Sequence, residues 1–193
     1  MNHTIISNPP LLLDQIESKC KEIGFTMPSD RHIGSLLKTL ISSKLSSNFL
    51  ELGTGIGLSL SWMIEGMDDN SKLTTIDNDP ALIDIAQEFF GNDRRVDIIC
   101  IDGTEWIQNY SGEKFDLIFA DAWPGKYSEL DEALALVKPG GLYVIDDMLP
   151  QPNWPEGHDE KAKRLIEDLD KRKDITLTKM DWSTGVVIAV KKS

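Results

Sequence analysis

Acidic residues stand at the ends of four predicted strands, where a parallel sheet would bring them together. They are Asp77, Asp102, Asp121 and the adjacent pair Asp146 and Asp147. Open parallel sheets bind their ligands outside the carboxyl ends of the strands. Chance placement would scatter acids over the surface, although turns also attract aspartate. We therefore expect these carboxylates to form one ligand-binding rim.

A glycine-rich loop follows the first strand, directly after Glu51, with its glycines at Gly53, Gly55 and Gly57. Glycine lets the backbone approach a ligand closely and adopt positive φ. The dinucleotide-binding fingerprint would need its third glycine one position later, where this chain has Leu58. A dinucleotide would also bring its pyrophosphate to the following helix, close to the negative charge of Glu51. The loop therefore favours a ligand that carries positive charge, such as S-adenosylmethionine (SAM).

Two of the strand-end acids suit a nucleoside. Asp77 follows the loop by about twenty residues, where a carboxylate can accept hydrogen bonds from both ribose hydroxyls. Enzymes that use NAD share this feature, so Asp77 supports a nucleoside without choosing between cofactors. Asp102 could accept from an adenine amino group or cap the next helix, and both roles can hold together.

Strands and helices alternate along most of the chain with short connections, which is typical of a parallel sheet covered on both faces. Helical spacing of apolar residues predicts two early helices, at 11–23 and from Ser29 or Asp30 to about 43. The last two strands have no helix between them, so they must be antiparallel neighbours. The predicted strands are 48–52, 72–76, 96–101, 115–120, 142–145, 175–179 and 186–191, and the later helices are 59–67, 80–90, 104–109, 128–137 and 160–172. We expect a single α/β domain over 1–193, in which helices at 1–46 cover the site and 47–193 form the ligand-binding core.

Composition limits the class of protein. The net charge of −12 repels phosphate backbones and argues against nucleic acid as the main partner. No apolar run approaches the roughly 20 residues that span a membrane, and we see no signal-peptide pattern. Two cysteines, Cys20 and Cys100, are expected to be small apolar fillers. These features predict a cytoplasmic protein.

Together these residues resemble the class I SAM-dependent methyltransferases, and more narrowly the cation-dependent O-methyltransferases of the catechol and caffeoyl-CoA type. The resemblance runs from about Met27 to Lys192. It rests on the stretches 49–59, 75–80, 115–121, 138–147 and 185–191. It implies a Rossmann-like fold with a mostly parallel seven-stranded sheet, the last strand antiparallel, and helices on both faces.

The resemblance also implies roles for individual residues. The methionine part of SAM would be held by the first glycine segment and its acid, and the nucleoside by the next two strand ends. Trp123 would pack on the adenine or serve in the rim, and Asp121 would contact both donor and acceptor. The implied donor-binding residues are Glu51, Gly53, Thr54, Gly55, Ser59, Asp77, Asn78, Asp102, Gly103, Asp121 and Trp123. Asp121, Asp146 and Asp147 would bind Mg²⁺ or another divalent cation, for which three acids are suitable oxygen ligands.

Two departures from that family concern the chemistry. Asp147 stands where the family usually has asparagine, which raises the negative charge of the implied metal site. Pro124 stands where the family has its catalytic lysine, and Lys126 follows two residues later. Lys126 could help to take the proton of the acceptor, or the chain has no lysine base. Without a metal, Asp121 or Asp146 could act as the base.

The expected function is methyl transfer from SAM to the oxygen of a small hydroxylated acceptor, an aromatic one being a candidate. The alternatives are transfer to nitrogen or to tRNA, a catalytically silent SAM-binding protein, and an NAD-dependent oxidoreductase. The proline-rich loop 148–158 with Trp154 is expected to form a substrate lid or a stiff connector. His158 is predicted to be a surface residue near a helix start. The apolar faces of the early helices would permit a homodimer.

Overall fold

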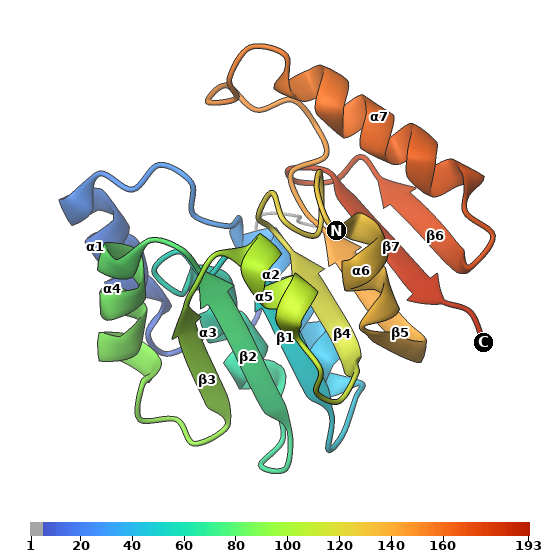
Figure 1. Cartoon of the computed structure of the whole chain (residues 1–193). Helices are drawn as coiled ribbons and strands as arrows, with labels where there is room; N and C mark the ends of the chain where they lie inside the picture. The colour runs from blue at the N-terminus through green and yellow to red at the C-terminus, as the bar shows by residue number, and fades with distance from the viewer. Residues whose placement is uncertain (1–5) are drawn as a thin grey trace.

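Seven strands form one sheet in the order β3-β2-β1-β4-β5-β7-β6 in the computed structural model, which describes residues 6–193 (Figure 1). β1 to β5 run parallel, and β7 lies antiparallel between β5 and β6. The strands are β1 (Asn48–Leu52), β2 (Lys72–Asp77), β3 (Val96–Cys100), β4 (Phe115–Ala120), β5 (Val137–Ile145), β6 (Ile175–Met180) and β7 (Val186–Lys191). The predicted Rossmann-like topology with an antiparallel last strand is confirmed. Residues 1–5, where the predicted N-terminal covering segment begins, lie outside the described residues.

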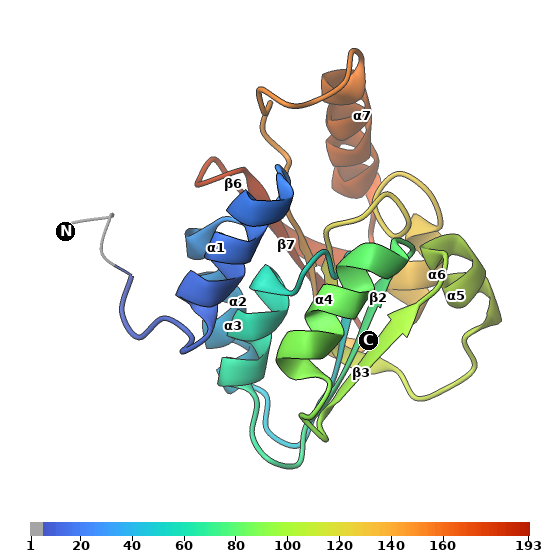
Figure 2. The ribbon, with the colours of Figure 1, turned by 90° about the vertical axis from the view of Figure 1, so that its left-hand side faces the viewer.

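Helices cover both faces of the sheet because successive strand residues point to opposite sides. Phe49 of β1 and Phe119 of β4 pack with the helices of one face, whereas Leu50 and Ile118 pack with those of the other. The first face carries α1 (Leu13–Ile23), α2 (Arg31–Ser42), α3 (Leu58–Gly66) and α4 (Pro80–Phe90). The second carries α5 (Gly103–Asn109), α6 (Leu130–Ala135) and α7 (His158–Lys171), as Figure 2 shows. Two separate apolar cores therefore hold the strand ends in place.

Three aspartates cap the N-termini of the helices α2, α4 and α5. The carboxylate of Asp30 accepts a hydrogen bond from the amide of His32 at the start of α2 (2.7 Å). Asp79 accepts from Ala81 (2.9 Å) at the start of α4, and Asp102 accepts from Glu105 (3.1 Å) at the start of α5. Each side chain satisfies a backbone amide that has no partner within its helix. The capping role considered for Asp102 is therefore present.

The region before β5 differs from the prediction. α6 ends at Ala135, and β5 begins at Val137 rather than at residue 142. Val137 pairs with Phe115 of β4, and the register then shifts before Leu117 pairs with Leu142. The sequence Lys-Pro-Gly-Gly is therefore part of an irregular strand, because pairing with β4 extends β5 beyond its apolar residues.

Gly57 shows why the loop after β1 needs its third glycine. Its φ is +94°, and a Cβ here would lie 2.8 Å from the ring of Phe90. We expect Gly57→Ala to lower the free energy of unfolding by about 3 kcal/mol, because it adds backbone strain and a clash in the core. Gly140→Ala is the matched control, since Gly140 has φ +77° but open space around it, and should cost about 1 kcal/mol. Equal losses in urea unfolding would contradict the proposed clash.

No helix within residues 6–193 is long and apolar enough to cross a membrane.

Candidate active site

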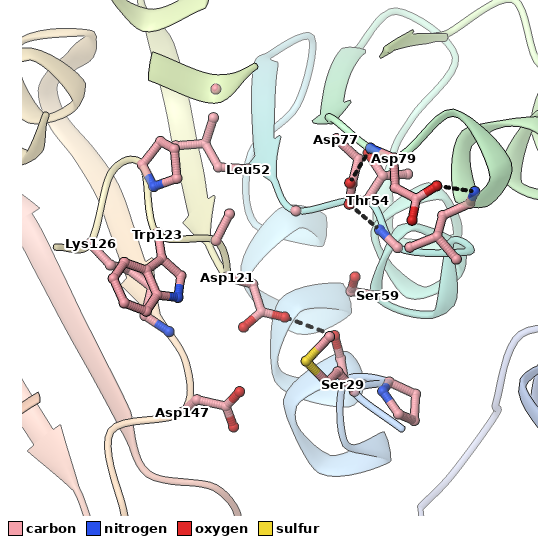
Figure 3. Close-up of a pocket in the computed structure, with 18 of the residues that line it drawn as sticks. Ser29, Leu52, Thr54, Ser59, Asp77, Asp79, Asp121, Trp123, Lys126 and Asp147 are labelled. Atoms are coloured by element: carbon pink, nitrogen blue, oxygen red, sulfur yellow. Dashed lines mark hydrogen bonds between the residues drawn. The ribbon is translucent and has the colours of Figure 1, made fainter. Parts of the chain in front are cut away.

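A cavity of about 900 Å³ lies at the carboxyl ends of the central strands. Its walls are the glycine loop after β1, the segment after β4, the segment after β5, and the linker 25–30 between α1 and α2. The strand-end acids Asp77, Asp102, Asp121 and Asp147 all line it, and Figure 3 labels three of them, Asp77, Asp121 and Asp147. The structure thus brings four of the predicted acids to one cavity. The early helices pack against α3, and it is their linker that reaches the site.

The glycine loop is fixed against its neighbours by backbone hydrogen bonds. The amides of Gly53 and Thr54 both donate to the carbonyl of Ile76 at the end of β2 (2.9 and 3.2 Å). Gly53 has φ +104°, and a Cβ there would lie 3.2 Å from the backbone of Asp121. Only glycine therefore lets the ends of β1, β2 and β4 approach this closely. Gly53, Thr54 and Gly55 line the cavity as predicted.

Asp77 is held rigidly at the end of β2. Its Oδ2 accepts from the amide of Gly55 (2.9 Å), and its Oδ1 accepts from the amide of Asp79 (3.1 Å). Each carboxylate oxygen has a further lone pair that can accept from a ligand hydroxyl. Asn78 and Gly103 line the cavity beside it, as predicted for the nucleoside end of the donor.

Glu51 lies behind the cavity wall, and this corrects the expectation that it contacts the donor directly. It is fully buried, and its oxygens accept hydrogen bonds from the hydroxyls of Ser59 (2.6 Å) and Thr75. Ser59 itself lines the cavity. Burial raises the pKa of Glu51 to about 7, with a smaller contribution from the charge of Asp77, while the two hydroxyls oppose the rise. Glu51 can therefore act on a ligand through Ser59, or through Thr75 and the cavity-lining Thr54 that is hydrogen-bonded to it.

Asp121 presents an unsatisfied oxygen at the centre of the site. Its Oδ2 accepts from the hydroxyl of Ser29 (3.2 Å), while its Oδ1 is buried and has no hydrogen-bond partner within residues 6–193. Burial raises the pKa of Asp121 well above its ordinary value; Asp146 and Asp147 add to the rise, and Lys126 opposes it. A buried acceptor without a partner suits a donor group of a ligand.

A tight turn after β4 directs Lys126 inwards. The amides of Lys126 and Tyr127 donate to the carbonyl of Trp123 (3.1 and 2.8 Å). Gly125, which lies between Trp123 and Lys126 in the turn, adopts φ +87°. The hydroxyl of Tyr143, buried in the sheet, donates to the carbonyl of Gly125 and anchors the turn. Lys126 is only 5% exposed and lines the cavity. The chain therefore does place a lysine in the site, as the sequence left open.

The two acids after β5 point to different places. Asp147 adopts φ +54°, a conformation that asparagine and aspartate tolerate better than most residues, and it lines the cavity. Asp146 is 1% exposed, and its Oδ1 accepts from the hydroxyl of Thr184 and the amide of Asp147. Across the described part of the chain, no three His, Cys, Asp or Glu residues are grouped to hold a metal ion. The predicted ligand set of Asp121, Asp146 and Asp147 is thus not assembled.

An aromatic cluster that the sequence did not reveal forms the wall beside Lys126; we define it as Trp123, Tyr127, Trp154 and His158. All four line the cavity, and the hydroxyl of Tyr127 lies 3.1 Å from Nε2 of His158. The rings of Trp154 and His158 are 4.3 Å apart, and those of Trp123 and Tyr127 are 5.6 Å apart. The ammonium of Lys161 lies 3.9 Å over the exposed ring of Trp123. Whether Trp123 packs on adenine stays a prediction.

His158 is not the surface residue that the sequence predicted. It is 8% exposed, because Trp154 and Tyr127 cover it. Burial lowers its pKa, and the charges of Lys126 and Lys161 lower it further. Trp154 in the proline-rich loop 148–158 was the sequence feature that could have indicated the burial of His158, because its ring packs on His158 at the start of α7.

The O-methyltransferase family model matches residues 3–192, nearly the whole chain. The chain belongs to the O-methyltransferase family. Among curated relatives, one from Mycobacterium avium (strain 104), named "Putative O-methyltransferase", is 32% identical over 118 residues, or 58% of this chain and 53% of the relative. The chain thus spans about half the length of the curated relatives it matches.

Solved structures of O-methyltransferases share the fold. The O-methyltransferase from Bacillus cereus, in complex with SAH, superposes with a TM-score of 0.82 at 20% identity, covering 97% of this chain and 94% of that one. The O-methyltransferase TomG from Streptomyces achromogenes, in complex with SAM, gives a TM-score of 0.83 at 22% identity and covers 98% and 93%. At these identities the likeness shows the fold alone.

Proposed function

We propose that this chain transfers a methyl group from SAM to a hydroxyl oxygen of a small aromatic acceptor. One observation carries the proposal: a single cavity joins an acidic, glycine-lined rim to an aromatic wall, and Asp121 and Lys126 lie between them. Membership of the O-methyltransferase family supports the same reaction class. The substrate itself is proposed from the site, because fold alone does not determine chemistry.

The donor side has the groups that SAM would need. Asp77 accepts from the ribose hydroxyls, and Asp102 can accept from the adenine amino group. The unpaired Oδ1 of Asp121 can accept from the ammonium of the methionine part. The cavity volume of about 900 Å³ lies at the upper end of typical ligand sites, so it has room for donor and acceptor together.

SAM supplies a methyl group on a positively charged sulfonium; the acceptor oxygen bonds to this carbon as the carbon–sulfur bond breaks and its electron pair passes to sulfur. The chain must hold the acceptor oxygen in line with that bond, which is a proximity effect. The hydroxyl proton leaves to a carboxylate that faces the cavity, Asp121 or Asp147. Asp146, considered as a base from the sequence, does not line the cavity, and its Oδ1 accepts from Thr184. The ammonium of Lys126 stabilises the developing negative charge on oxygen.

The cofactor is tested directly by calorimetry with SAM and then with NAD. We expect saturable binding of SAM and none of NAD. A panel of hydroxylated aromatic acceptors with labelled SAM, each assayed with Mg²⁺ and with a chelator, then tests the reaction. Binding of NAD in place of SAM would overturn the proposal, and binding of SAM with transfer only to nitrogen or RNA would overturn the acceptor class.

Trp154→Leu should weaken acceptor binding. The indole of Trp154 closes the aromatic cluster over His158, and an aromatic stacking contact contributes about 1 kcal/mol. We expect the KM for an aromatic acceptor to rise about fivefold while the affinity for SAM is unchanged. Trp106→Leu is the matched control, because Trp106 stacks on Tyr110 at 4.4 Å and does not line the cavity. Equal KM values in wild type and Trp154→Leu would exclude this wall from acceptor binding.

Two further proposals concern partners. The net charge of −12 supports a small-molecule acceptor rather than nucleic acid, and a cytoplasmic location follows only from the sequence features. Exposed Leu11, two residues before α1, and exposed Ile23, the last residue of α1, support a homodimer through the early helices. Light scattering at several protein concentrations tests this association.

A further inference from the structure

We propose that the ammonium of Lys126 provides the positive charge that the family resemblance assigns to a divalent ion, so that this site works without a metal. The inference rests on the proposed function and assigns the cation on its acceptor side. It concerns Lys126, Asp121 and Asp147, the three charged groups that surround one space in Figure 3.

The three aspartates implied as metal ligands do not all face the cavity. A divalent ion needs several oxygen ligands that converge on one point. Asp147 lines the cavity whereas Asp146 does not, and Asp146 already accepts from Thr184 and from a backbone amide. Asp121 has one oxygen committed to Ser29. Only part of the implied ligand set therefore faces the cavity.

Lys126 is buried at the cavity, near the same three aspartates. Its side chain is almost fully buried, and it is held there by the anchored turn after β4. Its positive charge opposes the rise in the pKa of Asp121, Asp146 and Asp147 alike, so it lies within reach of all three. Among the described residues its ammonium forms no ion pair within 4.0 Å with these carboxylates, and it lies 5.6 Å from the centre of the Tyr127 ring. An acceptor oxygen can therefore fit between the ammonium and the carboxylates.

The charges on the acceptor side of the cavity balance without a divalent ion. Six aspartates line the cavity, and two of them, Asp121 and Asp147, lie on the acceptor side beside Lys126. Lys126 and a SAM molecule, which has one net positive charge, neutralise them together. A divalent ion beside a buried ammonium would leave an excess of positive charge in a poorly solvated space, which is costly. The balance of the reaction is unchanged: the C–O bond forms, the C–S bond breaks and the proton leaves, while Lys126 stabilises the charge on oxygen.

Binding of Mn²⁺, followed by electron paramagnetic resonance in the presence of SAH, tests the inference without any acceptor. We expect no saturable binding to wild type up to about 1 mM, the range of the weakest protein cation sites. Lys126→Met should gain Mn²⁺ binding, because it leaves the carboxylates without their cation. Lys126→Arg and the control Lys163→Met should behave as wild type, since Arg keeps the charge and Lys163 is exposed on α7 outside the cavity.

Saturable Mn²⁺ binding to wild type overturns the inference, and so does a Lys126→Met variant that folds but gains none. If Lys126→Met does not fold, wild type decides. Labelled methyl transfer that is unchanged by EDTA supports the inference, whereas a tenfold loss restored by Mg²⁺ overturns it. Either result leaves the proposed function standing, because that proposal fails only if SAM does not bind or no hydroxyl is methylated.

Discussion

Replacing Asp121 with asparagine should slow methyl transfer by about 10²–10³-fold, while the affinity for SAM falls by only about tenfold. Asn keeps the size of the side chain and its contact with Ser29, so the change removes charge without opening a cavity. The variant should therefore fold normally. Its effect measures what a negative charge at the junction of donor and acceptor contributes.

The rate of methyl transfer should fall more than the affinity for SAM, because Asp121 would contribute more to the transition state than to binding of the donor. In the proposed site, donor binding would be shared with Asp77, Asp102 and the glycine loop, so we expect the loss of one charged hydrogen bond to be moderate. Transfer, as we propose it, would depend on a fixed arrangement of Asp121, Asp147 and Lys126 around the reacting oxygen. Charges that are already oriented for the transition state affect the rate more than they affect ground-state binding.

Single-turnover transfer with labelled SAM and calorimetry with SAM alone measure the two quantities. Asp97→Asn is the matched control, because Asp97 is an exposed aspartate of β3 that does not line the cavity. It should change neither quantity. An Asp121→Asn variant with the turnover of wild type would remove Asp121 from the reaction, whatever its affinity for SAM.

The strand-end acids were predictable because two simple regularities combine. Apolar runs locate the strands, and in a parallel sheet their carboxyl ends share one edge. This places Asp77, Asp102 and Asp121 at one cavity without knowledge of any side-chain contact. The start of the second helix was narrowed to Ser29 or Asp30, since capping depends on neighbours in the sequence, and the structure has Asp30 as the cap.

What the sequence could not show depends on contacts between distant segments. Asp146 and Asp147 look equivalent in the sequence, but only Asp147 lines the cavity, while Asp146 accepts a hydrogen bond from Thr184, 38 residues beyond it. His158 is buried only because Tyr127 and Trp154 cover it. Glu51 is buried behind Ser59 because β1 lies in the middle of the sheet, between β2 and β4. The order of the strands in the sheet cannot be read from the sequence pattern.

Replacing Glu51 with glutamine should stabilise the ligand-free protein at neutral and alkaline pH. Burial raises the pKa of Glu51 from 4.5 to about 7. Between these values the folded chain holds a proton that the unfolded chain has lost, so the free energy of unfolding falls as the pH rises. A shift of this size corresponds to about 3 kcal/mol, all of it lost above the folded-state pKa.

Urea unfolding of both proteins between pH 4.5 and pH 8 isolates this effect, because other titrating groups contribute equally to both. The stability of Glu51→Gln relative to wild type should increase with pH and level off above about pH 7. Glu105→Gln serves as the control, since Glu105 is an exposed acid on α5 whose removal should give no such trend. A difference between Glu51→Gln and wild type that stays constant with pH would mean that the carboxylate is not destabilised by burial.

The same variant should also bind SAM less tightly, and this explains why the chain keeps a charge that costs stability. An ionised Glu51 accepts the hydroxyl proton of Ser59, so the Ser59 oxygen can direct its lone pairs towards the cavity. A cationic ligand there favours the ionised form, and binding should release a proton near neutral pH. Strain of this kind is typical of functional sites, where stability is given up for binding. Calorimetry of SAM in buffers of different ionisation enthalpy detects the proton in wild type, and its loss in Glu51→Gln would assign it to this carboxyl.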